Sequence, residues 1–468
     1  MPPQAEWNLD ALDQRQVRAA RFIARTLRDV GFEAWLVGGC VRDLYMGNTP
    51  HDLDLATDAT PDDIEGLFKS TIGVGRAFGT MIVIHREAGE LIGSEQRGES
   101  QLEQLKGAFS KPELPGIDSL EATTLMNDVG IEVTSYRSDG EYTDSRRPDD
   151  VTYVSSAEID ASRRDFTCNA IYLDPLDNRI FDPAHGCDDI DARVLRCVGN
   201  PKQRFEEDGL RLMRMARFQA RFDFNAEAGL HDTAREERES LRGVSIERVV
   251  AELEKIFNGP RSARAIEILM DCRLFEVCLP AEWSRLSSPT DGERVALISA
   301  FPKAPGLVLG LAALFGGDPE SADRAAPLAL LAQFKLARAT LRSIQGIWAG
   351  ERELFDLLKG SEQRARRIRL VRDVEWPLIS ELHRARLQSN SQDPSDLDEL
   401  IDWSAALTAT QLHPAPLLEA KDLAKTEAPR GPLWGQLLRE LEDGQLSGTL
   451  SDRSGALAWL RKRVAELR

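Results

Sequence analysis

The sequence predicts an α+β fold, with an N-terminal head built on a mixed β-sheet and an all-α neck, body and tail behind it. Residues 35–58 give a strand, a glycine turn, a short helix and a second strand, and the β-branched stretches 79–84 and 130–137 predict two further strands. From about residue 204 the apolar residues recur at helical spacing as far as the end of the sequence. This periodicity predicts helices throughout the second half.

Two helices are predicted around these strands. Residues 9–30 carry apolar side chains at helical spacing, which predicts an amphipathic helix packed against the sheet. Thr60 and Pro61 are typical of an N-cap and a first helical residue, so a further helix is expected to run to Phe68.

Length and composition bound the class of protein. The 468 residues are enough for two to four domains with substantial cores. Hydrophobic residues make up 42% and charged residues 29%, and no uninterrupted apolar run reaches the length that crosses a bilayer. The N-terminus lacks the basic region and apolar core of a signal peptide, so a cytoplasmic protein without a membrane partner is expected.

The six cysteines are expected to be reduced structural thiols. None belongs to a Cys-x-x-Cys pair, and most stand among apolar residues. Zinc ligation and disulfides are therefore both disfavoured.

The stretch 35–58 contains the parts of a phosphate site. Its first strand stops at Gly38 and Gly39, where a backbone without Cβ lets a phosphate approach the N–H groups that open a helix carrying Arg42. We therefore expect Gly38, Gly39 and Arg42 to hold a triphosphate.

Asp52 and Asp54 alternate with Leu53 and Leu55 just after this turn. On a strand, that spacing points both carboxylates to one face and both leucines into the core. Two hard oxygen ligands beside a phosphate cradle suit Mg²⁺ and two-metal phosphoryl transfer. Asp52 and Asp54 are thus predicted to be the metal ligands and catalytic residues of nucleotidyl transfer. An Asp-x-Asp by itself is more often a solvated strand edge, and it is the combination with the glycine turn that favours function.

This combination, Leu-Val-Gly-Gly-x-Val-Arg-Asp followed by Asp-Leu-Asp, resembles the signature of class II CCA-adding enzymes and bacterial poly(A) polymerases. These form a branch of the polymerase-beta-like nucleotidyltransferases. The resemblance covers about residues 30–282, and from Ala281 onward no family motif is found. It implies addition of CMP and AMP to the tRNA 3′ end, with CTP, ATP and tRNA as partners and Mg²⁺ as cofactor.

The resemblance also suggests three domains. Residues 1–156 are expected to form the catalytic head, 157–282 a neck and body with recognition motifs and RNA-binding helices, and 283–468 a helical body and tail with a role in tRNA contact. About residues 87–128 depart from the family pattern with a polar stretch rich in Gly, Ser, Gln, Glu and Pro. We interpret it as an insertion in a hairpin, for which disorder, RNA contact and neutral decoration all remain open.

Glu132 lies between Ile131 and Val133 and points to the opposite side of its strand from both. The resemblance places an acid on this strand near the metal pair. Glu132 is therefore the expected third catalytic carboxylate, and a plain solvent-facing strand residue is the alternative.

Residues 163–171 resemble the ribose motif of the family, Arg-Arg-Asp-Phe-Thr-x-Asn-Ala. Arg164 is expected to meet phosphate and Asp165 to accept a hydrogen bond from a ribose hydroxyl, while Phe166 and Ile171 face the core. The polar loop 138–148 resembles the flexible loop of members that add the terminal A.

Residues 204–218 are expected to open one long helix that selects the base. By resemblance, Asp208 and Arg211 present a Watson–Crick-like edge to CTP or ATP, and Arg214 belongs to the same nucleotide-binding set. The alternative is an i,i+3 ion pair between Asp208 and Arg211. Gly209 is expected to weaken this helix and loosen the base-selecting pair.

The net charge of −18 disfavours indiscriminate nucleic-acid binding but allows a local basic track. The candidates for such a track, which are equally typical of a solvated helix face, are Lys335, Arg338, Arg342, Arg364, Arg366, Arg367, Arg369 and Arg372.

Two rival functions remain. One is an A-adding enzyme or poly(A) polymerase that uses ATP only. The other is an inactive RNA-binding protein, which the presence of both metal carboxylates disfavours. The sequence does not determine the oligomeric state.

Overall fold

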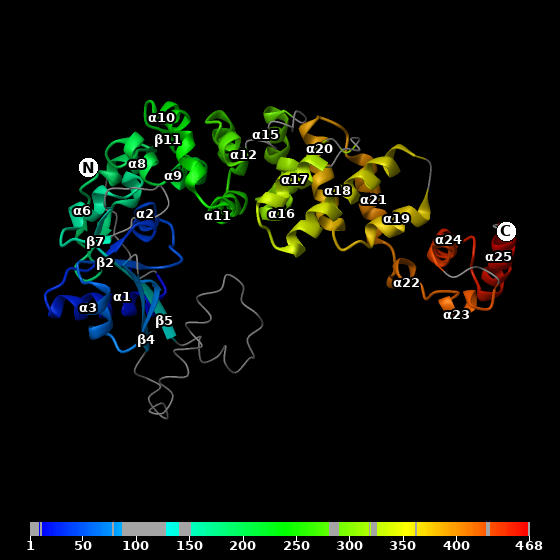
Figure 1. Cartoon of the computed structure of the whole chain (residues 1–468), viewed down its shortest axis with the longest axis horizontal. Helices are drawn as coiled ribbons and strands as arrows, with labels where there is room; N and C mark the ends of the chain where they lie inside the picture. Colours follow the sequence, from blue (N-terminus) through cyan, green and yellow to red (C-terminus); the bar gives the residue numbers. More distant parts are fainter. Residues whose placement is uncertain are drawn as a thin grey trace, which may run out of the picture. The chain divides into compact units, whose positions relative to one another are not determined.

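The computed structural model describes residues 9, 12–76, 79–86, 128–139, 151–279, 290–317, 319, 325–360, 363–426 and 431–466 (Figure 1). It forms two compact units. The head unit comprises Met1–Ser245 with Asp271–Val277, and the helical unit comprises Ile246–Met270 with Cys278–Arg468. The predicted fold class, a mixed-sheet head followed by helices, is confirmed. The division into three domains stays a prediction.

The head unit is built on a seven-stranded sheet with the order β3-β4-β5-β2-β1-β8-β9. Only β2 and β5 pair in parallel within this described sheet, and its other neighbours are antiparallel. The seven strands are β1 (Trp35–Val37), β2 (Asp54–Thr57), β3 (Thr71–Gly75), β4 (Thr80–Arg86), β5 (Asp128–Ser135), β8 (Tyr172–Leu173) and β9 (Ile180–Phe181).

Smaller elements complete the head unit. Two pairs of short strands lie outside the main sheet, β6 (Arg137–Asp139) with β7 (Val151–Tyr153), and β10 (Val194–Leu195) with β11 (Asn225–Ala226). The helices are α1 (Gln14–Asp29), α2 (Gly39–Tyr45), α3 (Pro61–Leu67), α6 (Ala157–Ser162), η3 (Thr167–Asn169), α7 (Gly186–Asp191), α8 (Pro201–Glu207), α9 (Leu210–Phe222), α10 (Leu230–Glu236) and η4 (Glu237–Gly243).

Helix α1 covers one face of the sheet and packs on β5, as its predicted amphipathic pattern requires (Figure 1). Its inward side chains include Val17, Ile23 and Leu27, all buried. The predicted helix after β2 is also confirmed, because Thr60 and Asp63 form a reciprocal capping box at the start of α3.

Helix α6 lies against the opposite face. Its Ala157 and Ala161 belong to one buried cluster with Val37 of β1, Ala56 of β2 and Tyr172 of β8. Alanines allow this close approach of helix and sheet because they carry no side chain beyond Cβ. The C-terminal end of α6 is thereby held over the face of the sheet that carries Ala56 and, two residues before it, Asp54.

The hairpin in which the insertion was predicted is present, and the insertion itself stays a prediction. Strands β4 and β5 pair without interruption from Thr80↔Thr134 to Arg86↔Asp128, so the extra segment leaves from and returns to the end of one ladder. The predicted span, about 87–128, is therefore 87–127, and it lies outside the described residues.

The single long helix predicted over residues 204–218 is wrong. The chain forms α8 and α9 instead, and Asp208 and Gly209 separate them. Asp208 adopts an extended conformation at the end of α8. A Cβ on Gly209 would lie 2.2 Å from the backbone oxygen of Ser240 in η4. Gly209 thus permits a close contact with η4, a role that the predicted weakening of a continuous helix did not foresee.

The helical unit has a core of its own and a small separate apolar cluster near the C-terminus, centred on Leu437, Leu441 and Leu460. None of the helices in the described ranges is both long and apolar enough to cross a membrane. The first helices after the head elements are, in chain order, α11 (Ile246–Phe257), α12 (Ser262–Asp271), α13 (Leu274–Cys278) and α15 (Asp291–Ser299). The others are α16 (Gly306–Phe315), α17 (Ala325–Gln333), α18 (Arg338–Lys359), α19 (Arg364–Val371), α20 (Trp376–Ser389), α21 (Ser395–Ala405), α22 (Ala409–Leu412), α23 (Ala420–Leu423), α24 (Pro432–Ser447) and α25 (Arg453–Glu466).

Deleting residues 93–126 and joining the ends with a short Gly/Ser linker should leave a protein that melts cooperatively within a few degrees of the full chain. The β4–β5 ladder is complete up to Arg86↔Asp128, and loop length affects stability only through a slowly varying entropy. Calorimetry measures the transition. Val133→Asp, which puts a charge into the buried face of β5, serves as the control that must lower the melting temperature. Loss of the cooperative transition in the deletion protein would contradict the insertion interpretation.

Candidate active site

The predicted carboxylates Asp54 and Glu132 lie side by side on neighbouring strands. Asp54 opens β2, and its partner across the parallel pairing with β5 is Glu132. Cross-strand partners project from the same face of a sheet, and this is the face of Ala56 and α6. The leucines that alternate with the carboxylates, Leu53 and Leu55, are buried as predicted. Asp52 precedes the strand and is exposed, because β2 begins two residues later than the predicted strand.

The charges of these three carboxylates act on one another. The pKa of Asp54 is raised to about 6, mostly by burial and then by the charges of Glu132 and Asp52, while Arg164 opposes the rise. The pKa of Glu132 is also raised, by desolvation and by Asp52. Such mutual repulsion is relieved when a divalent cation is bound.

The donor set fits a hard cation such as Mg²⁺, because all three groups are carboxylate oxygens. In the ranges that the structure describes, no three His, Cys, Asp or Glu side chains already stand close enough together to enclose a metal. The metal role of Asp52 and Asp54 therefore stays a prediction.

The glycine turn between β1 and α2 has the geometry that a close backbone approach requires. Gly38 has φ +78°, a region that favours glycine, and it caps the N-terminus of α2. A Cβ on Gly38 would lie 3.6 Å from Nη1 of Arg164. The thiol of Cys40, one turn further, is buried and donates to the Val37 oxygen at 3.2 Å. Burial raises the pKa of Cys40 to about 12, so this thiol stays protonated.

Arg42 points inward from the turn. Its guanidinium is buried, and Nε and Nη2 donate to Asp43 at 2.9 and 2.7 Å. Nη1 donates to Asn169, and the ring of Phe222 lies 4.4 Å away. Arg42 thus ties α2 to η3 and α9, beneath the turn that was predicted to hold phosphate with it.

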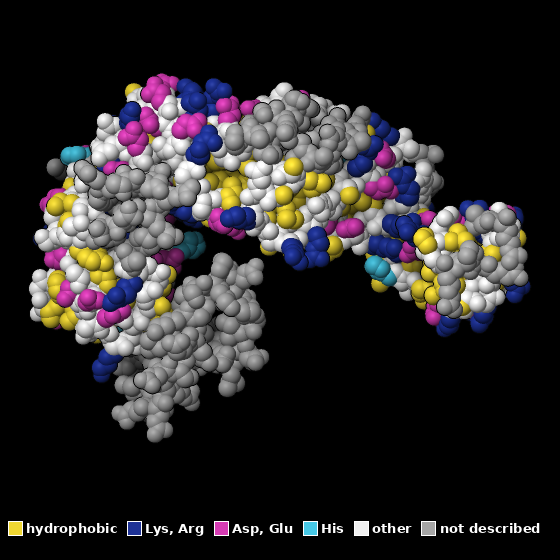
Figure 2. All heavy atoms as spheres, viewed as in Figure 1, with side chains coloured by type: hydrophobic (Ala, Val, Ile, Leu, Met, Phe, Trp, Pro, Cys, Tyr) yellow, Lys and Arg dark blue, Asp and Glu magenta, His cyan; other side chains and the backbone are white. Residues whose placement is uncertain are grey.

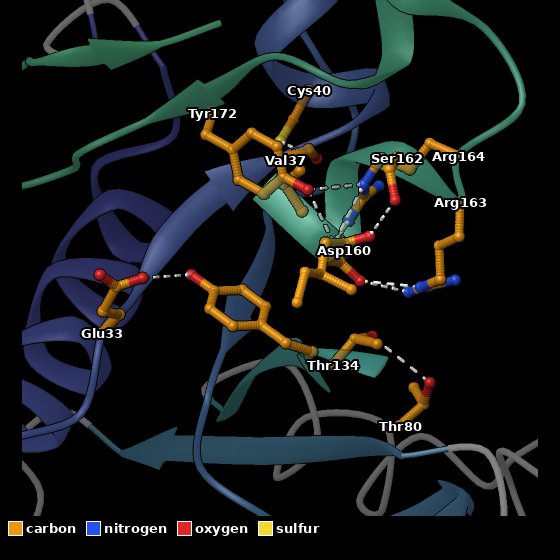
Figure 3. Close-up of polar contacts among 12 residues, drawn as sticks. Glu33, Val37, Cys40, Thr80, Thr134, Asp160, Ser162, Arg163, Arg164 and Tyr172 are labelled. Atoms are coloured by element: carbon orange, nitrogen blue, oxygen red, sulfur yellow. Dashed lines mark hydrogen bonds and ion pairs between the residues drawn. The ribbon is translucent and has the colours of Figure 1, made fainter. Parts of the chain in front are cut away.

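Arg164 occupies the position beside the turn. It follows α6, and its Nη2 donates to Asp160 at 2.7 Å while its Nε donates to the Tyr172 hydroxyl at 3.0 Å (Figure 3). Its charge lowers the pKa of Asp54. The structure therefore brings Arg164 of the predicted ribose motif close to Gly38 and Asp54 of the stretch 35–58.

Asp160 is a site residue that sequence analysis missed. It is fully buried one turn before the arginine pair, and it also accepts from Nε of Arg163 at 2.9 Å (Figure 3). Burial alone would raise its pKa, but Arg164 and Arg163 outweigh this and lower it to about 2. Its i,i+3 and i,i+4 spacing to the two arginines was a detectable signal.

Asp165, which is buried, and Arg214, which is half-buried, form a second ion pair. Arg214 Nε donates to Asp165 at 2.7 Å, and Asn169 Nδ2 donates to the other oxygen at 3.0 Å. Since Asn169 also accepts from Arg42, one network joins three predicted nucleotide-binding residues. Phe166 and Ile171 are buried in the core as predicted.

Asp208 and Arg211 lie at the junction of α8 and α9, and the Arg211 N–H donates to the Asp208 oxygen at 2.9 Å. Asp208 is half-buried and accepts from the Leu210 N–H at 3.0 Å. Arg211 is buried, and its Nη1 donates to Glu207 at 2.6 Å. Its Nη2 donates to the Arg163 oxygen at 2.8 Å. The segment predicted to select the base is thus bonded to the backbone of Arg163, the residue before Arg164.

The predicted basic track of the helical unit is largely paired. Arg366 bonds Glu353 at 2.6 Å, while Arg369 and Arg372 both bond Glu442 of α24, at 2.8 and 2.7 Å. Figure 2 shows basic side chains interspersed with acidic ones over the face that it draws. These pairs favour a structural role for the three arginines. The polar loop 138–148 lies outside the described residues beyond β6.

The fold and the site define a nucleotidyltransferase, in which acidic side chains on a mixed sheet face a glycine turn. A family model for the poly A polymerase head domain matches residues 34–107 and 92–196. A second model, for a probable RNA and SrmB-binding site of polymerase A, matches residues 223–285. The two matched stretches of the head model overlap over residues 92–107, within the predicted insertion.

Known relatives agree with these models. The CCA-adding enzyme of Bacillus pumilus (strain SAFR-032) is 31% identical over 325 residues, which are 69% of this chain and 69% of that protein. The chain belongs to the class II CCA-adding enzyme and bacterial poly(A) polymerase family. With the CCA-adding enzyme of Bacillus subtilis (strain 168) the identity is 35% over 254 residues, which span about half of each protein (54% and 53%).

Solved structures share the fold over nearly the whole chain. The Bacillus stearothermophilus CCA-adding enzyme in complex with CTP has a TM-score of 0.67 at 24% identity, covering 96% of this chain and 97% of that one. The Thermotoga maritima CCA-adding enzyme complexed with tRNA has a TM-score of 0.63 at 16% identity, covering 99% and 98%. The likeness extends past residue 282, where the sequence shows no family motif.

Asp165→Asn should lower stability at neutral pH by about 2 kcal/mol and by much less in acid. Burial alone would raise the pKa of Asp165, but Arg214 and Asn169 hold it at about 2 against an ordinary value of 3.8. A carboxyl whose folded pKa is depressed stabilises the fold above its unfolded pKa and loses this contribution as the pH falls towards its folded pKa. Urea unfolding from pH 6 down to pH 2.5 measures the gap between the two proteins.

The exposed Asp29 at the end of α1 supplies the control variant, Asp29→Asn, for which little difference is expected at any pH. A stability gap for Asp165→Asn that stays constant over this pH range would contradict the assigned ion pair.

Proposed function

We propose that the protein adds CMP and AMP to the 3′ end of tRNA, without a nucleic-acid template, and releases pyrophosphate. The observation that carries this proposal is the pairing of Asp54 with Glu132 across β2 and β5, beside the Gly38 turn and Arg164. Membership of the family supports it, as do relatives and neighbours that are CCA-adding enzymes. A cytoplasmic location agrees with this role.

The carboxylates Asp52 and Asp54, with Glu132 beside them, would hold the divalent metal, which we take to be Mg²⁺. A metal bound there would supply Lewis-acid activation of the primer hydroxyl and positive charge for the departing pyrophosphate. Gly38 and Gly39 bring backbone N–H groups to the triphosphate, and Arg164 supplies the nearest guanidinium. Arg42, buried under the turn, acts by fixing α2 rather than by reaching the phosphate.

Base choice falls to the segment where α8 gives way to α9. The half-buried carboxylate of Asp208 offers acceptors, and Arg211 offers donors from a guanidinium that Glu207 keeps in place. Asp165, paired with Arg214, is proposed to bind the ribose. Asn169 also donates to Asp165 and so fixes the orientation of its carboxylate.

Asp52→Ala and Asp54→Ala should each lower nucleotide incorporation by about a thousandfold or more, because each removes a metal ligand from the chemical step. Filter binding should show tRNA affinity within about threefold of the unchanged protein, since the RNA surface is not altered. Asp58→Ala is the matched control. This carboxylate follows β2 and bonds the Glu33 N–H, and its loss should not affect chemistry. Near-normal turnover of either site variant with Mg²⁺ would overturn the catalytic assignment.

The nucleotide specificity is tested with tRNAs that end before the CCA, after its first C or after its second C, each given CTP, ATP or both. We expect both nucleotides to be used and growth to stop after one A. Incorporation of ATP alone, onto the end that already carries both cytidines, would identify an A-adding enzyme. Long A tails on unrelated RNA would identify a poly(A) polymerase.

In the same assay, Arg211→Ala should reduce the discrimination against UTP and GTP more than it slows overall transfer. Because Arg211 also bonds the Arg163 and Arg204 oxygens, its removal is expected to cost stability as well. Asp208→Ala keeps those bonds and provides the comparison, with a similar loss of discrimination and a smaller change in melting temperature. Unchanged discrimination in both variants would contradict the assigned role.

A further inference from the structure

We propose that Asp160 and Tyr172 are positioning residues that hold Arg164 against the Gly38 turn, so that the triphosphate is gripped in the same way whichever base it carries. This inference rests on the proposed function and deepens it. It assigns phosphate binding to Arg164, just after α6, and base selection to the junction of α8 and α9.

The contacts of Arg164 leave its guanidinium little freedom. Asp160 Oδ2 accepts from its Nη2 at 2.7 Å and from its Nε at 3.2 Å. The Tyr172 hydroxyl accepts from the same Nε at 3.0 Å and donates to Asp160 at 2.8 Å. The ring of Tyr172 lies 5.3 Å from the guanidinium carbon. Three groups thus form a closed triangle of charge-assisted bonds (Figure 3).

The remaining nitrogen of Arg164 is directed to the turn. Nη1 lies 3.6 Å from the place where a Gly38 Cβ would be, and within the described part of the chain no acceptor bonds it. Gly38 has φ +78°, a conformation that favours glycine, and a Cβ there would already be in van der Waals contact with this nitrogen. A phosphate oxygen bound at the Gly38 turn would therefore lie within reach of Nη1.

The charges favour an anion at this point. Asp160 shares its single negative charge between Arg163 and Arg164, with Arg163 bonded to Oδ1 and Arg164 to Oδ2. The three side chains therefore keep one net positive charge. Asp160 is buried, and a buried carboxylate is tolerated only where such partners satisfy it.

In the described part of the chain, a bond to the backbone links the phosphate-binding arginine segment to the base-selecting segment. Arg211 bonds the main-chain oxygen of Arg163 and does not touch the Asp160 triangle. A substitution of Asp160 or Tyr172 should therefore raise the dissociation constants of CTP, ATP and inorganic triphosphate by the same factor. The preference between CTP and ATP should not change.

The experiment measures dissociation constants of CTP, ATP and inorganic triphosphate by calorimetry at a fixed MgCl₂ concentration. Asp160→Asn should raise all three dissociation constants by roughly tenfold, and Tyr172→Phe should raise them several-fold, as expected for the loss of bonds to a charged group. Asp174→Asn is the matched control. Asp174 is equally buried and paired with an arginine, Arg28, but lies on the β8–β9 turn. Its loss should lower the melting temperature without changing triphosphate affinity.

A double-mutant cycle tests whether Asp160 acts through Arg164. In an Arg164→Ala background the effect of Asp160→Asn on triphosphate affinity should disappear. An undiminished effect there would overturn the proposal, as would unchanged triphosphate affinity in both Asp160→Asn and Tyr172→Phe. If Asp160→Asn does not fold, Tyr172→Phe, which keeps the ring and removes only the hydroxyl, decides by itself.

Failure of the proposed function has a different signature. A protein that incorporates neither CMP nor AMP into tRNA, yet loses triphosphate affinity in Asp160→Asn as expected, would retain the positioning role and lose the assigned reaction.

Discussion

The parallel pairing of β2 with β5 is the constraint on which the site depends. Parallel neighbours cannot be joined by a tight turn, so the chain passes through α3, β3 and β4 before β5 returns beside β2. The register sets Asp54 against Glu132. A slip of one residue would turn Glu132 to the face that α1 covers and bring Ile131 or Val133 into its place. Seven consecutive β4–β5 partners prevent that slip, even though the insertion enters at the end of this same hairpin.

Around these acids, arginines are fixed by buried acceptors. Asp160 holds Arg164, Asp165 holds Arg214, and Glu207 holds Arg211, each with at least one bond of 2.7 Å or less. Fixing a long side chain in advance spares the entropy that it would otherwise lose on binding nucleotide. The overall charge of −18 is therefore compatible with a polyphosphate substrate, since the site depends on local and oriented positive charge rather than on an excess of it.

Local patterns in the sequence were enough to predict the parts of the site that are set by the backbone. The Gly38 turn, the capping box at Thr60 and the burial of Leu53 and Leu55 all follow from the preferences of a few adjacent residues. The inward direction of Arg42 was not predictable in this way, because its acceptor Asn169 lies 127 residues further along the chain. Asp160 was missed because it stands outside the motifs, although its helical spacing to the two arginines was visible.

The break between α8 and α9 shows how tertiary contact overrode a helical pattern. Residues 204–218 have continuous helical periodicity, yet the backbone of η4 lies where a side chain on Gly209 would be. The break puts Asp208 in an extended conformation, in which its carboxylate caps the Leu210 N–H. Beyond the break, Arg211 bonds Glu207 and the backbone oxygens of Arg163 and Arg204. The surroundings of the two residues that are proposed to select the base are therefore set by contacts with η4 and with the segment after α6, and not by the helical periodicity of their own segment.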